Sequence, residues 1–146
     1  MKYKSLYELN NYISRQLRMA LPSPIWVTAE VSSVSHNASG HCYLELVEKS
    51  VQNDNIIARQ RATIWASRYN EIHSRFVNVT DSELKAGISI LFCCEVQFHE
   101  VYGMSVNIID IDPVFTVGDI QRRKLEIIKR LTEEGLIKLN SLRPLP

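Results

Sequence analysis

The chain has 146 residues, of which 45% are hydrophobic and 23% are charged, a composition typical of one globular domain with a short extension at each end. No apolar run approaches the roughly 18 residues of a membrane span, and the first ten residues lack the apolar core of a signal peptide, so we expect a cytoplasmic protein with no membrane partner. The net charge of +1 argues against polyanion binding by the molecule as a whole.

Charge is unevenly distributed along the chain. Residues 1–68 carry 8 Lys and Arg against 5 Asp and Glu, residues 69–119 carry 2 against 8, and residues 120–146 carry 7 against 3. A polyanion would therefore be attracted to the first and last segments rather than to the middle one.

The first predicted element is a helix over residues 5–20. Ser5 and Glu8 form a capping box, and Pro22 and Pro24 end the helix. Apolar residues recur along it at three- and four-residue spacing: Leu6, Leu9, Ile13, Leu17 and Ala20.

A β-hairpin is predicted over residues 25–47, and the remaining elements are arranged around it. Its turn, residues 37–40, reads Asn-Ala-Ser-Gly, and Gly40 can take the positive φ that a reversal needs. Alternation places one set of side chains inward: Ile25, Val27, Ala29, Val31, Cys42, Leu44 and Leu46. The opposite faces carry Trp26, Thr28, Glu30, Ser32, His41, Tyr43, Glu45 and Val47.

A third alternating strand follows over residues 56–66. Its residues Ile57, Arg59, Arg61, Thr63 and Trp65 share one face. With Tyr43 on the neighbouring strand, the two arginines make an aromatic and basic surface of the kind that stacks bases and holds phosphates. Taken from the residues alone, exposed strand positions without a ligand remain the alternative.

The order of the later elements predicts the fold. A short helix over residues 67–76 separates the third strand from two more, over residues 88–101 and 104–115. Three strands, a helix and two strands are the order of an OB-fold, a five-stranded Greek-key barrel that binds oligonucleotides on its second and third strands. We predict a mainly β protein: this barrel, with an N-terminal helix and a C-terminal linker helix.

The last segment is predicted to be a hinge over residues 116–119 and a helix over residues 120–134. Leu125, Ile128 and Leu131 are placed inward, and Gly135 is the C-terminal stop. Arg122 and Arg123 belong to a basic cluster that can follow a phosphate backbone or form a solvated face. We therefore divide the chain into a nucleic-acid-binding domain, 1–118, and a helical linker, 119–146, that leads to an absent catalytic domain.

No catalytic residue, metal site or cofactor is predicted. Phosphate-binding loops, dinucleotide fingerprints, HExxH helices and GxSxG elbows are absent. The four histidines are dispersed, and an exposed strand edge explains Asp110 and Asp112 better than a Mg²⁺ site does. Cys42, Cys93 and Cys94 have no CxxC spacing, which favours reduced, buried thiols.

Several segments resemble, in order, the amino-terminal region of the large subunit of bacterial exodeoxyribonuclease VII. They are the first helix, IWVTAEVSSVS, SGHCYLELVEK, RATIWA and EEGLIKLNSLRPLP. The most specific pieces are Ser39-Gly40-His41 followed by Tyr43, and Glu134-Gly135-Leu136 followed by the RPLP ending. Cys42 stands where family members usually carry an aromatic residue, and Val47-Glu48-Lys49 where Lys-Asp is common.

This resemblance implies an OB-fold that holds single-stranded DNA for a nuclease domain beginning after RPLP, so this chain would not cut DNA by itself. It also implies activity without a required metal ion, and assembly with copies of a small helical subunit through regions outside this chain. The candidate nucleic-acid-binding residues are Tyr43, Arg59, Arg61, Trp65, His41, Arg122 and Arg123.

Three other functions remain open. One is an anticodon-type RNA-binding OB domain, because synthetases also place a helix before such a barrel. Another is a scaffold whose barrel binds a protein partner and no nucleic acid, and the third is an independent enzyme. Binding that weakens steeply with salt would favour nucleic acid over an apolar protein contact.

Overall fold

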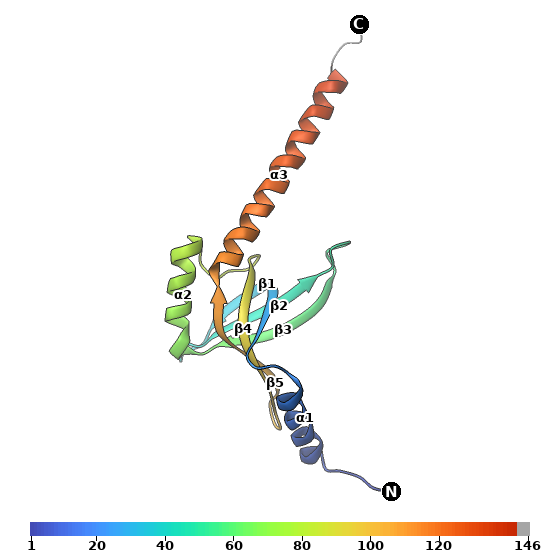
Figure 1. The fold of residues 1–146 in the computed structure, drawn as a ribbon, viewed down its shortest axis with the longest axis vertical. Coiled ribbons are helices and arrows are strands. Elements are labelled where there is room, and N and C mark those ends of the chain that lie inside the picture. Colours follow the sequence, from blue (N-terminus) through green and yellow to red (C-terminus); the bar gives the residue numbers. More distant parts are fainter. Residues whose placement is uncertain (143–146) are drawn as a thin grey trace.

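The computed structural model describes residues 1–142, which fold into a β-barrel with three helices around it (Figure 1). The elements follow the chain in this order: α1 (Leu6–Ala20), β1 (Ile25–His36), β2 (Cys42–Lys49), β3 (Ile56–Ile64), α2 (Ala66–Thr80), β4 (Ser89–His99), β5 (Gly103–Asp112) and α3 (Pro113–Leu142). Figure 1 shows α1 and α3 projecting from opposite ends of the barrel, while α2 stands at its side.

The five strands close into a barrel in the order β1-β2-β3-β5-β4. The long β1 strand pairs with β4 along its first half and with β2 along its second half, both antiparallel. The barrel closes between β3 and β5, which run parallel and are joined at Thr63 and Asn107. The predicted OB-fold, with a helix between the third and fourth strands, is confirmed.

A β-bulge in β1 changes which side chains face outward. The pairing with β2 shifts between Val31 and Ser33, so one extra residue is inserted at that point. Beyond the bulge Val34 packs against the core, while Ser33 and Ser35 pair across from Glu45 and Tyr43. Strict alternation continued from Ile25 would turn Ser33 and Ser35 inward, but the predicted alternation ends at Ser32, next to the bulge.

The core fills the barrel and extends to α2. Leu44, which was predicted to face inward, is buried, and Ile64 of β3 and Phe76 of α2 are fully buried with it. Cys42, Cys93 and Cys94 are buried and unpaired, as predicted. Burial raises the pKa of the Cys42 thiol to about 11, so this thiol is not a reactive thiolate at neutral pH.

Helix α1 begins as predicted but packs differently. The side-chain oxygen of Ser5 accepts a hydrogen bond from the N–H of Glu8 at 3.1 Å, which caps the helix. Of the predicted apolar stripe, Leu6 and Leu9 are exposed, whereas Ile13 and Leu17 are partly buried. In addition, Asn10 and Asn11 donate hydrogen bonds to Glu100, at the β4–β5 turn.

Three predictions about the end of the chain are wrong, and all three concern helix α3. It follows β5 directly, so the predicted hinge at residues 116–119 lies inside the helix. Gly135 lacks the positive φ of a C-terminal cap, and the helix continues to Leu142. Leu125, Ile128 and Leu131 are exposed rather than inward. The RPLP ending lies outside the described residues.

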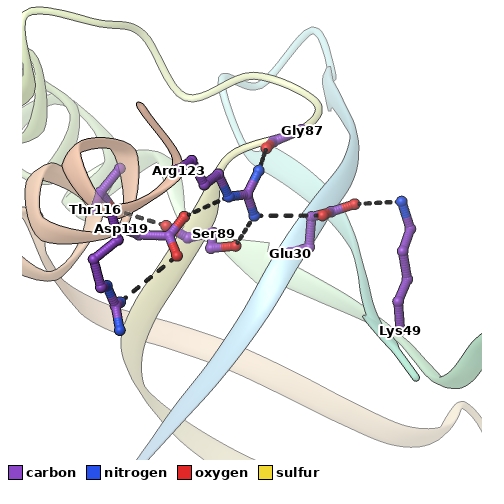
Figure 2. Close-up of polar contacts among 8 residues, drawn as sticks. Glu30, Lys49, Gly87, Ser89, Thr116, Asp119 and Arg123 are labelled. Atoms are coloured by element: carbon purple, nitrogen blue, oxygen red, sulfur yellow. Dashed lines mark hydrogen bonds and ion pairs between the residues drawn. The ribbon is translucent and has the colours of Figure 1, made fainter. Parts of the chain in front are cut away.

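The first turns of α3 are fixed to the barrel by polar contacts (Figure 2). Thr116 is fully buried, and its hydroxyl donates to the carbonyl oxygen of Ser89 at 2.9 Å. The Arg123 guanidinium pairs with Asp119 at 3.0 Å and with Glu30 at 3.8 Å, and it donates to Ser89 Oγ at 2.8 Å and the Gly87 carbonyl at 3.2 Å. Because these partners belong to α3, β1 and β4 and the loop before β4, the helix leaves the barrel in a defined direction.

In the part of the chain that the structure describes, no helix combines the length and apolarity needed to cross a membrane.

Candidate nucleic-acid interface

The centre of the candidate interface is the outward face of β1, β2 and β3. Tyr43 pairs with Thr63 and Glu45 pairs with Arg61 across β2 and β3. A hollow of about 170 Å³ opens on this face, lined by Ser33, Ser35, Tyr43, Leu44, Glu45 and Arg61. The structure therefore brings together the two predicted residues that are best suited to a nucleotide, an aromatic ring and a guanidinium.

The Tyr43 side chain is held by the turn between β1 and β2. Its hydroxyl oxygen accepts a hydrogen bond from the Asn37 amide nitrogen at 3.0 Å. The Asn37 side-chain oxygen in turn accepts from the N–H of His41 at 2.9 Å. One turn residue, Asn37, thus orients both predicted site residues, and asparagine is a residue type that favours turns because its side chain can bond to nearby backbone groups.

Arg59 lies on the same face but is already paired. Its Nε lies 3.2 Å from Oε1 of Glu45, and both side chains are partly exposed. A pair this exposed contributes less than about 1 kcal/mol to stability, so a phosphate can compete for the arginine. Sequence reasoning placed Glu45 outward without assigning it this role.

His41 and Trp65 form a second group where α2 begins. The two rings are edge to face, with centroids 4.7 Å apart. His41 Nδ1 accepts from the N–H of Ala66 at 2.9 Å, which leaves Nε2 as the nitrogen that carries the proton in the neutral ring. Trp65 follows the end of β3 and is the N-cap residue of α2. The prediction that it shares the strand face of Arg59 and Arg61 is therefore wrong.

Arg122 and Arg123 lie apart from this group, on α3. Within the described residues, their polar contacts are with Glu30, Gly87, Ser89 and Asp119 rather than with the predicted strand residues. Arg123 is mainly an anchor for α3 (Figure 2). Arg122, 3.7 Å from Asp119, is the more exposed of the two.

The acidic residues considered for a metal site have other roles. Asp110 forms an ion pair with Arg75, and Asp112 accepts a hydrogen bond from the N–H of Val114 at the start of α3. Among the described residues, no cluster of three or more His, Cys, Asp or Glu side chains has the geometry to hold a metal ion.

Residues 4–112 match the family described as the OB-fold nucleic acid binding domain. Three curated relatives are exodeoxyribonuclease 7 large subunits: from Deinococcus radiodurans, 33% identical over 99% of this chain and 35% of the relative; from Hahella chejuensis, 26% over 97% and 28%; and from Thioalkalivibrio sulfidiphilus, 29% over 94% and 27%. The chain thus spans between about a quarter and a third of these relatives, and the predicted resemblance is confirmed.

Proposed function

Because the chain belongs to the family of OB-fold nucleic acid binding domains, we propose that it binds single-stranded DNA and positions it for a nuclease. The observation that carries this proposal is the hollow where Tyr43 and Arg61 meet on the open β2–β3 face. Aromatic stacking requires unpaired bases, which favours a single strand over a duplex. We propose DNA rather than RNA as the ligand because the relatives are named exodeoxyribonucleases.

In this proposal the nuclease reaction takes place outside the chain. Residues 1–118 supply the binding domain, and the part of α3 beyond Arg123 acts as a spacer. The relatives are named large subunits, so we expect a small subunit as a second partner. That partner binds elsewhere than the Tyr43 face, because nucleic acid occupies that face.

The proposal is tested by titrating the chain into a fluorescently labelled oligo(dT) and following anisotropy at several salt concentrations. Each phosphate neutralised on a single strand contributes about −0.7 to the slope of log affinity against log salt. Contacts from two or three arginines therefore predict a slope of about −1.4 to −2.1. Tighter binding of oligo(U) than of oligo(dT) would favour the anticodon-type alternative, and no binding of either would favour the protein scaffold.

Glu45 competes with phosphate for Arg59, which leads to a separate prediction. Glu45→Gln removes the carboxylate that now pairs with Arg59, and it also removes a negative charge from the hollow. We expect the affinity for oligo(dT) to rise by about three- to tenfold. Glu48→Gln is the matched control: Glu48 is exposed on the same strand but outside the hollow, and its replacement is expected to have a smaller effect. A fall in affinity for Glu45→Gln would mean that Glu45 itself contacts the ligand.

A further inference from the structure

A second aromatic hollow lies on the barrel, beside α2. Trp26 points outward from β1, and half of its surface is exposed. It borders a hollow of about 300 Å³ whose lining residues are Trp26, Arg68, Glu71, Ile72, Arg75, Cys93, Ile109 and Asp110. None of the residues assigned to the proposed DNA-binding face lines this hollow.

Of the two arginines that line this hollow, one is already paired with a carboxylate and the other is not. Arg75 is bound to Asp110 and also donates to the Ile111 carbonyl at 3.2 Å. Arg68 is exposed and forms no ion pair with any residue among those described. Glu71 lines the same hollow and, among the described residues, also forms no ion pair. Arg68 is therefore the side chain that can neutralise a phosphate here.

Arg68 also connects this hollow to the first candidate interface. Its backbone N–H donates to the carbonyl of Trp65 at 2.9 Å, in the first turn of α2, while its side chain lines the hollow with Trp26. Arg68, which lines this hollow with Trp26, thus lies three residues along the chain from Trp65, and each of the two tryptophans is about half exposed.

We infer that Trp26 is a second base-stacking platform, reached by a single strand that runs from the Tyr43 face over the start of α2, with Arg68 holding a phosphate between Trp65 and Trp26. This inference rests on the proposed function and extends its binding site. Nucleic acid fits this hollow better than a protein partner does, because the hollow pairs an open indole with an unpaired guanidinium, the combination used to bind single strands.

Because Trp26 and Trp65 are the only tryptophans, each can be observed alone. In Trp65→Phe the emission reports Trp26, and in Trp26→Phe it reports Trp65, while anisotropy of a labelled oligo(dT) follows binding independently. Single-strand site sizes on OB-folds range from about 4 to 16 nucleotides. We expect an oligomer of about 12 nucleotides to quench both tryptophans, and one of about 4 nucleotides to quench Trp65 more than Trp26.

Two further variants test the bridging role of Arg68. Arg68→Ala is expected to weaken binding of the 12-mer by about threefold or more and to affect the 4-mer less, whereas Glu71→Gln strengthens binding of the 12-mer. Binding of the 12-mer without any change in Trp26 emission, or with equal losses for both oligomers in Arg68→Ala, would overturn the inference and leave the proposed function intact. If neither oligomer binds the unmodified chain, both fail.

Discussion

Replacing Tyr43 and Arg61 together by alanine is expected to lower the affinity for single-stranded DNA by about 30- to 1,000-fold. The stacked base lost with Tyr43 is worth about 1 to 3 kcal/mol, and Arg61 adds a phosphate contact in the same hollow. Both side chains lie on the outward face of the barrel, so the core remains intact. Anisotropy titrations with oligo(dT) at one fixed salt concentration measure the loss, and far-UV circular dichroism checks the fold.

The matched control for this double variant is Tyr12→Ala with Arg15→Ala. These two substitutions remove the same chemical groups, a phenol ring and a guanidinium, from exposed positions on α1. We expect the control to change affinity less than threefold, because α1 docks at the β4–β5 turn and not on the β2–β3 face. Equal losses in both double variants would mean that the chain binds DNA by charge alone, and the proposed face would be wrong.

Phe76→Ala is expected to have the largest effect on stability, a loss of about 3 to 5 kcal/mol in the free energy of unfolding. Phe76 is fully buried and joins α2 to the barrel core together with Ile72. Without it, the start of α2 that carries Trp65 and Arg68 loses its support. Urea unfolding followed by circular dichroism gives the free energy.

Val79→Ala serves as the control on the same helix. Val79 is exposed on α2, so its truncation should change the free energy of unfolding by less than about 0.5 kcal/mol. A loss below about 1 kcal/mol for Phe76→Ala would show that α2 does not unfold together with the barrel.

The strands and the barrel could be predicted because their signal is local. Alternation identified Cys42, Leu44 and Leu46 as inward residues of β2, although it placed Val47, which is buried, on the opposite face. The order of strands and helix then left the OB-fold as the matching topology. The bulge between Val31 and Ser33 could not be predicted in this way, because an inserted residue breaks the alternation from which the faces were deduced.

The errors in α3 have a different cause. Pro113 is compatible with the start of a helix, and a glycine inside a helix costs only about 1 kcal/mol, so neither Pro113 nor Gly135 forces a boundary. The spacing of Leu125, Ile128 and Leu131 describes one face of the helix but does not say what covers it.

The ion-pair partners of the charged side chains also could not be predicted from the sequence. Arg59 with Glu45, and Arg123 with Glu30, are far apart in the sequence and meet because the barrel topology brings their strands and helix together. Sequence therefore proposed both arginines as free cations, and the structure shows that each has a carboxylate partner. For the candidate site, the types of the residues could be predicted from the sequence. Whether an arginine is free to bind a phosphate or is already paired with a carboxylate could not.

The contacts of Thr116 and Arg123 give α3 a fixed rotational phase relative to the barrel. A straight helix of 30 residues is about 45 Å long, and each residue turns it by about 100°. Inserting one residue after Lys124 would therefore rotate every later side chain of α3 by that angle and advance it by about 1.5 Å. Seven inserted residues would restore the original orientation to within about 20°. The number of residues in this helix thus sets the orientation of its far end about the helix axis, and an insertion or deletion changes that orientation.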